Sequence, residues 1–270
     1  MYPGITLYHL TIPSYWVMAL IGAILSFLFV HIRKRKFHIP GDDVTHIFLF
    51  CVVGGIIGAK LLHLLVALPN VLAHLDVMNT QPDLWTDYFL NGFVFYGGVI
   101  GGFLFALWYC KRYRIYFLEA CDLFTPILPF FHIFGRIGCF CAGCCYGRET
   151  HAWYGITFTH SDFAPNGVSL IPTQLISSGL DFLNCIFLMW FAGKKKGDGQ
   201  VAGLYLVCYS VGRFVLEFFR GDLERGSVGS LSTSQFIAIF TAVAGVVLFF
   251  WFGKRKTEEK EIQEETAAEE

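Results

Sequence analysis

The chain has 270 residues, of which 55% are hydrophobic and only 15% are charged, and its mean hydropathy is +0.55. A soluble globule of this size needs more polar side chains to cover its surface, so the composition excludes an ordinary soluble protein and favours a membrane protein. The formal net charge is −1, and the 20 basic residues fall in short clusters between apolar runs. This distribution excludes a protein that binds nucleic acid by a basic face.

Seven apolar runs approach or reach the roughly 20 residues that a membrane-spanning helix needs. They cover about residues 15–30, 44–68, 92–109, 117–134, 170–192, 201–219 and 234–252. The first 15 residues contain no Lys or Arg. A cleavable signal peptide would begin with basic residues, so we expect the first run to stay in the membrane. The sequence therefore predicts an all-α, polytopic bundle of about seven spans.

Basic clusters follow the odd-numbered runs, whereas the loops after even-numbered runs are poorer in Lys and Arg. The clusters lie at residues 33–36, 111–114, 194–196 and 254–256. By the positive-inside rule, we expect the N-terminus outside and the C-terminus in the cytoplasm. Residues 257–270 contain seven Glu and no aromatic residue. We therefore expect one membrane domain over residues 1–256 and a disordered acidic tail over residues 257–270.

Ionisable residues within apolar runs are informative because lipid makes them costly. Arg213 and Glu217 are spaced i, i+4 in the sixth run, Arg220 lies about a turn further on, and Arg136 lies near the outer end of the fourth run. One interpretation is an intrahelical ion pair of Arg213 with Glu217 that offsets the cost of its own burial. That pair leaves the other two arginines unexplained. Because a guanidinium matches phosphate oxygens, we expect the arginines to converge on an anion such as a phospholipid headgroup.

Two further features of the apolar runs each allow two interpretations. Gly97 and Gly98 follow Tyr96 in the third run and could serve close helix packing or line a site for the headgroup. His132 lies four residues before Arg136 and hence on the same helix face. It could move a proton or simply pack, because the sequence identifies no partner for it.

Four of the nine cysteines, Cys139, Cys141, Cys144 and Cys145, lie within seven positions on the expected outer side. As zinc ligands they are unconvincing, because a structural zinc site usually draws two pairs from separated segments. The spacing of Cys141 and Cys144 permits a redox site, but the surrounding thioredoxin pattern is missing. A stabilising disulfide or packed thiols is the simplest interpretation. The alternative function is a membrane thiol-redox or metal-handling protein that uses this cluster.

Residues 135–148, Gly-Arg-Ile-Gly-Cys-Phe-Cys-Ala-Gly-Cys-Cys-Tyr-Gly-Arg, resemble the signature loop of the prolipoprotein diacylglyceryl transferase family. The surrounding motifs occur in the family's order, at residues 96–101, 122–129, 172–175, 212–220 and 231–235. The resemblance extends from Tyr15 to about Phe252. Five ordered motifs in a polytopic chain are specific, although each alone would be weak.

The resemblance implies a multi-pass enzyme of the bacterial inner cell membrane that needs no metal or organic cofactor. Such an enzyme moves the diacylglyceryl group of phosphatidylglycerol to the lipobox cysteine of a prolipoprotein and releases glycerol phosphate. Its partners are therefore phosphatidylglycerol, the lipobox segment and the bilayer, and not nucleic acid. The candidate residues that bind phosphatidylglycerol are Arg136, Tyr15, Arg220, Gly97 and Gly98.

The reaction needs a thiolate and a stabilised leaving anion, since a free thiol has a pKa of about 8.5. Arginines supply the second requirement. The candidate catalytic residues are Arg213, Glu217, Tyr96 and His132.

The chain also departs from the family pattern at several positions. The usual His before the paired glycines is Tyr96, and the usual Asn and Glu of the signature loop are Cys139 and Cys144. A common His-Pro-Ser-Gln-Leu-Tyr-Glu segment reads Ile-Pro-Thr-Gln-Leu-Ile-Ser at residues 171–177. The arginines are thus kept, while several groups that could carry protons are replaced.

Overall fold

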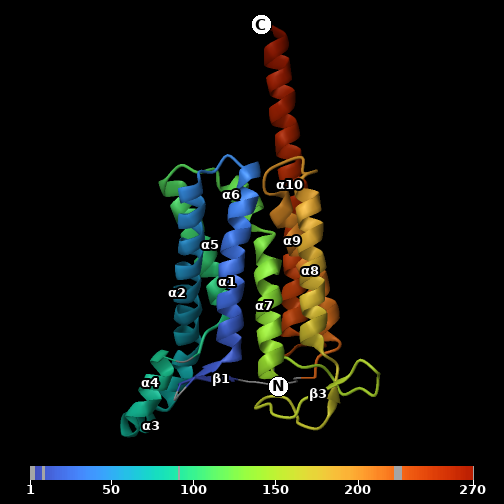
Figure 1. Cartoon of the computed structure of the whole chain (residues 1–270). Helices are drawn as coiled ribbons and strands as arrows, with labels where there is room; N and C mark the ends of the chain where they lie inside the picture. Colours follow the sequence, from blue (N-terminus) through green and yellow to red (C-terminus); the bar gives the residue numbers. More distant parts are fainter. Residues whose placement is uncertain (1–3, 8–9, 91, 222–226, 270) are drawn as a thin grey trace. The chain divides into compact units, whose positions relative to one another are not determined.

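The computed structural model describes residues 4–7, 10–90, 92–221 and 227–269 and is mainly helical (Figure 1). Its helices are α1 (Ser14–Arg33), the 3-10 helix η1 (Lys34–Lys36), α2 (Gly41–Ala73), α3 (Leu75–Thr80), α4 (Pro82–Leu90), α5 (Phe95–Arg112), α6 (Phe117–Phe124), α7 (Ile127–Ala142), α8 (Thr173–Ala192), α9 (Gln200–Glu217) and α10 (Thr233–Glu269). Three antiparallel strand pairs join β1 (Gly4–Leu7) to β2 (Leu10–Pro13), β3 (Ile156–Thr157) to β4 (Ser169–Leu170), and β5 (Ser227–Val228) to β6 (Leu231–Ser232). The predicted all-α class is confirmed, with these short pairs as additions.

Within the described residues, five helical segments are long and apolar enough to cross a membrane. They are Ser14–Lys36, Gly41–Ala73, Phe117–Ala142, Thr173–Ala192 and Thr233–Lys254. The third and sixth apolar runs also form helices, α5 and α9, of 18 residues each. A multi-pass helical membrane protein is thus supported, while the number of seven spans and the orientation stay predictions.

The fourth apolar run differs in detail from the single helix expected over residues 117–134. α6 ends at Phe124 and α7 begins at Ile127, directly after Pro126. Proline lacks the N–H that a continuous helix requires and disfavours helical geometry at the residue before it. α7 then continues to Ala142 and ends at Gly143, whose φ of 77° suits glycine. The first half of the signature loop is therefore helical.

The chain forms two compact units, residues 34–117 and residues 1–33 with 118–270. In the first of these, α2 and α5 pack through glycines. A Cβ atom added at Gly58 would lie 2.8 Å from the Cα of Gly101, and one at Gly98 would lie 3.3 Å from the carbonyl oxygen of Gly55. A Cβ at Gly97 would collide with the carbonyl of Gly58. Close helix packing therefore accounts for Gly97. The role of Gly97 and Gly98 in lipid binding stays a prediction.

In the second unit, α7 packs against α1 and α8, and α9 packs against α8 and α10 (Figure 1). A Cβ at Gly138 of α7 would lie 3.2 Å from the Cα of Tyr15, so α1 and α7 approach closely at their ends. The hydroxyl groups of Ser210 and Thr241 are 2.6 Å apart and tie α9 to α10. These helices form the scaffold of the site described below.

The fully buried carboxylate of Asp122 joins α6 to the start of α9. Its oxygens accept the backbone N–H of Gly199 at 2.9 Å and of Val201 at 3.1 Å, and the ammonium of Lys195 at 2.7 Å. The first N–H groups of a helix have no partner within that helix, so Asp122 caps α9 from another element. Arg33 of α1 donates to the carbonyl of Asp122 at 3.0 Å and adds a third helix to this junction.

The acidic tail continues α10 as helix to Glu269, although we expected it to be disordered (Figure 1). Residues 257–269 consist mostly of Glu, Lys, Gln and Ala, which have high helix propensity. The expectation of disorder rested on the negative charge of this segment and did not include that propensity. The division into a membrane domain and a separate tail stays a prediction.

The junction at Asp122 can be tested against a more exposed pair that shares the same lysine. Asp122→Ala leaves the backbone N–H groups of Gly199 and Val201 without their acceptor and takes one of two carboxylates from Lys195, so we expect a loss of about 3 kcal/mol of stability. Asp198 also contacts Lys195, at 2.8 Å, but its side chain is 27% exposed. Asp198→Ala should cost less than about 1 kcal/mol. Thermal unfolding of both variants in one detergent measures the difference, and equal melting temperatures would contradict the capping role.

Candidate active site

A cavity of about 260 Å³ lies between α7, α8 and α9, within one compact unit. Its wall is largely apolar but includes two arginines and one aspartate. The lining residues are Arg136, Ser177, Leu180, Asp181, Leu183, Asn184, Phe187, Cys208, Tyr209, Gly212, Arg213 and Leu216. An apolar cavity with a few convergent polar groups is typical of a small-molecule site.

Arg136 of α7 contributes an unsatisfied donor to the cavity wall. Its Nε atom is buried and has no hydrogen-bond partner in the part of the chain that the structure describes. A guanidinium cannot release its proton to escape burial, so an unpaired buried donor is costly. This donor therefore indicates a ligand that accepts hydrogen bonds, and an anion suits its charge.

Arg213 of α9 is held by two neighbours. Its Nη2 atom lies 2.8 Å from the hydroxyl of Ser234 and 2.9 Å from Oε2 of Glu217. The predicted ion pair with Glu217 is thus present. Arg213 also interacts electrostatically with Arg136 and Arg220. Arg136, Arg213 and the nearby Arg220 carry three positive charges against the two carboxylates of Glu217 and Asp181, so one further anion would balance the charge of this region.

His132 has a partner that the sequence analysis missed. Its Nδ1 atom lies 3.2 Å from Oδ2 of Asp181, which belongs to α8, lines the cavity and is 8% exposed. The ring of His132 also approaches that of Tyr209, with centroids 5.8 Å apart. Asp181 is the only charged residue in the apolar run 170–192. Because ionisable residues in such runs are costly and informative, the criterion that identified the arginines would also have identified Asp181. The contact is an ion-pair distance and not a hydrogen bond, since Asp181 Oδ2 has no hydrogen-bond partner among the described residues.

The start of α8 holds the second half of the signature loop in place. The hydroxyl of Thr173 donates to the carbonyl of Cys145 at 2.8 Å, and Nε2 of Gln174 donates to the carbonyl of Cys144 at 2.8 Å. The backbone N–H of Cys144 donates to the carbonyl of Cys139 at 3.1 Å. Two of the motifs identified in the sequence therefore meet here.

The end of α9 holds the same loop from another side. The backbone N–H of Arg148 donates to the carbonyl of Phe219 at 2.9 Å, and Nε of Arg148 donates to the carbonyl of Arg220 at 3.2 Å. The N–H of Gly221 donates to the carbonyl of Tyr146 at 3.1 Å. Arg220, which is 7% exposed, is therefore fixed beside the signature loop.

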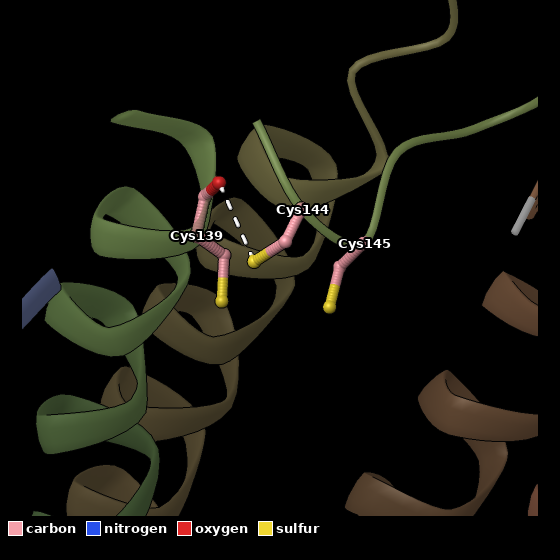
Figure 2. Close-up of side chains that lie close together, drawn as sticks. All are labelled: Cys139, Cys144 and Cys145. Carbon is pink, nitrogen blue, oxygen red and sulfur yellow. Dashed lines mark hydrogen bonds between the residues drawn. The ribbon is translucent and has the colours of Figure 1, made fainter. Parts of the chain in front are cut away.

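Three of the four clustered cysteines point toward one another in Figure 2. The Sγ atoms of Cys139, Cys144 and Cys145 lie within 4.8 Å of one another, and Cys141 is not a member of this group. All three are free thiols, so of the two expected arrangements, a disulfide or packed thiols, the structure has packed thiols at these described residues. Hydrogen bonds with the other two thiols, together with Arg220, lower the pKa of Cys145.

Tyr15 and Tyr96, the two predicted tyrosines, lie in different units. Tyr15 opens α1 beside Gly138 and interacts electrostatically with Arg136 and with the three clustered cysteines. Tyr96 lies in the first turn of α5 and is 47% exposed. The structure thus brings Tyr15 to the arginine region, and the role of Tyr96 stays a prediction.

The contact of Gln174 with the signature loop gives a test of the scaffold. Gln174→Leu removes the donor to Cys144, but it also removes Oε1, a buried acceptor without a partner, so we expect a loss of only about 1 kcal/mol. Gln174→Glu places a carboxylate against the carbonyl and should be the less stable variant. Thermal unfolding in detergent ranks the three proteins. A glutamate variant as stable as the unmodified chain would show that this amide does not hold the loop.

The chain was compared with known proteins. The prolipoprotein diacylglyceryl transferase family model matches residues 4–251. A protein from Clostridium tetani named phosphatidylglycerol–prolipoprotein diacylglyceryl transferase is 40% identical over 90% of this chain and 94% of the relative. One from Clostridium perfringens, named phosphatidylglycerol–prolipoprotein diacylglyceryl transferase 2, is 40% identical over 90% of this chain and 92% of the relative. One from Legionella pneumophila strain Corby is 29% identical and covers 91% of this chain and 94% of its own length. The chain therefore belongs to the prolipoprotein diacylglyceryl transferase family.

Proposed function

We propose that the chain transfers the diacylglyceryl group of phosphatidylglycerol to the lipobox cysteine of a prolipoprotein and releases glycerol phosphate. The observation that carries this proposal is the unsatisfied Nε of Arg136 in the wall of a cavity that Arg213 also lines. The names of the relatives support the substrate assignment. Nucleic acid has no place in this account.

The arginines would act on the phosphate that leaves. Arg136 offers hydrogen bonds to the lipid phosphate, and Arg213 and Arg220 add positive charge nearby. The thiolate attacks the glyceryl carbon, the carbon–sulfur bond forms, and the carbon–oxygen bond to phosphate breaks. Charge grows on the departing phosphate during this step, so fixed cations lower its barrier. Tyr15 is placed to contact the same lipid headgroup.

The acceptor thiol must lose a proton before it attacks. We propose His132 as a proton acceptor because the carboxylate of Asp181, 3.2 Å away, would stabilise the positive charge that the ring gains. Glu217 is paired with Arg213 and is the second candidate. Tyr96 stays a third candidate, as do Gly97 and Gly98 for contact with the lipid.

We further propose seven spans in the bacterial inner cell membrane, with α5 and α9 as the third and sixth. The length of both helices and the basic clusters after odd-numbered runs support this arrangement. It puts the N-terminus and the signature loop outside and the acidic tail inside. A lipobox thiol and an outer-leaflet lipid could then meet at the loop.

If Arg136 binds the lipid phosphate, a substitution that keeps its charge should still lower the rate of transfer strongly. Arg136→Lys should lower transfer about 10²- to 10³-fold, because an ammonium cannot reproduce the forked hydrogen bonds of a guanidinium. Mass spectrometry of a synthetic lipobox peptide, incubated with the purified chain and phosphatidylglycerol, measures the transfer. Arg35→Lys, at an exposed arginine outside the cavity, is the matched control and should keep full activity. Near-normal transfer by Arg136→Lys would remove this residue from the site.

The pair on α9 is proposed to serve both stability and catalysis, and a double-mutant cycle separates the two. Glu217→Gln leaves Arg213 without its carboxylate and should cost about 3 kcal/mol. Adding Arg213→Met removes the unpaired charge, so the double variant should regain stability. It should still fail to transfer lipid, because the departing phosphate has lost a fixed cation. Thermal stability and peptide transfer are measured on the two single variants and the double variant in one detergent.

Recovery of both stability and transfer in the double variant would contradict the catalytic assignment. Arg213 and Glu217 would then form only a structural ion pair.

A further inference from the structure

The three thiols of Figure 2 have nearly the spacing that one metal ion requires. Zinc binds thiolate sulfur at about 2.3 Å in tetrahedral geometry, so two thiolates on one ion lie about 3.8 Å apart. The Sγ atoms of Cys139, Cys144 and Cys145 all lie within 4.8 Å of one another. Shifts of less than about 1 Å would bring them to this spacing.

The backbone that carries these thiols is fixed by groups outside the cluster. Cys139 lies in the last turn of α7, and Thr173 and Gln174 hold the carbonyls of Cys145 and Cys144. Cys145 has a φ of 61°, a conformation that a non-glycine residue adopts at a cost and only when its surroundings require it. The loop therefore presents three thiols together before any ligand binds.

We propose that Cys139, Cys144 and Cys145 bind one thiophilic divalent ion such as Zn²⁺ through three thiolates and leave its fourth position open. Soft sulfur ligands favour zinc over magnesium or calcium. A closed structural site has four protein ligands, whereas three ligands and an open position are typical of zinc sites that bind substrate. Three thiolates and Zn²⁺ carry a net charge of −1, and Arg220, which is buried beside the signature loop, carries the opposite charge.

The open position suits the thiol of the acceptor cysteine, and this step rests on the proposed function. A thiol that binds zinc becomes more acidic, gives its proton to the acceptor of the proposed function, His132, and becomes a thiolate. Its sulfur then attacks the glyceryl carbon, and the phosphate leaves with the electrons of the carbon–oxygen bond. The resulting thioether carries no charge and departs from the ion. Two of the ligands, Cys139 and Cys144, occupy positions where the chain departs from the family's usual Asn and Glu.

Metal content of the full chain gives the first test. The protein is purified in detergent with a reductant, loaded with Zn²⁺ and freed of excess ion, and we expect one zinc per chain by elemental analysis. Cys139→Ser, Cys144→Ser and Cys145→Ser should each lose it, whereas the matched control Cys141→Ser should keep it. Bound zinc should also protect the three thiols of the unmodified chain from alkylation but leave Cys141 reactive, which needs no variant to fold.

Cobalt substitution gives the second test and reads the open position directly. Co²⁺ in the site should give thiolate-to-metal charge-transfer absorption. A lipobox peptide should increase this absorption, and the same peptide with Ser in place of Cys should not.

The possible outcomes separate this proposal from the proposed function. No bound zinc in the reduced chain, equal zinc in the Cys141→Ser and Cys145→Ser variants, or a disulfide within the trio in the membrane would overturn the metal site. Identical cobalt spectra with the two peptides would overturn the role of the open position. Zinc binding and a peptide response without diacylglyceryl transfer would instead refute the proposed function and leave the site standing.

Discussion

The main constraint on this structure is the positive charge of three arginines, Arg136, Arg213 and Arg220, in a largely apolar chain. Hydrogen bonds or negative charges must offset it. Arg213 interacts electrostatically with Arg136 and Arg220, and it forms an ion pair with Glu217. An arginine cannot lose its proton, so burial must be offset by hydrogen bonds or by an anion. The Nε of Arg136 has no hydrogen-bond partner among the described residues, so part of this requirement is left open. In the proposed function a lipid phosphate would meet it, and the same contact would stabilise the leaving group.

The rest of the unit keeps these charges at fixed positions. Asp122 caps α9, the helix that carries Arg213, and the α8 residues Thr173 and Gln174 hold the signature loop. Arg148 in turn binds the carbonyl of Arg220. Preorganised cations stabilise developing charge without reorganisation during the reaction, so these remote contacts bear on catalysis. The alternative function, a membrane thiol-redox or metal-handling protein, does not explain why these arginines lie near one another.

Much of the helical plan was predictable from the sequence because apolar run length and membrane thickness are directly related. All seven runs form helix, and the ion pair of Arg213 with Glu217 follows from their i, i+4 spacing. The break at Pro126 was also readable in principle, because proline interrupts a helix whatever its hydropathy.

Contacts between helices that are distant in the sequence were harder to predict. The pairing of His132 with Asp181 joins α7 to α8, and no local spacing encodes it. The convergence of Cys139 with Cys144 and Cys145 depends on the turn at Gly143 and on a left-handed residue at Cys145. The spacing of these cysteines does not match the two separated pairs of a usual structural zinc site, but the fold brings three of their thiols together from one segment. Local turn geometry, and not spacing alone, decides such a cluster.

Complementation of a bacterial strain depleted of its own diacylglyceryl transferase tests the central claim most directly. We expect expression of this chain to restore growth and the diacylglyceryl modification of lipoproteins, detected by mass spectrometry of their N-terminal peptides. A chain that reaches the membrane in normal amounts, yet leaves the lipobox cysteines unmodified, would contradict the account.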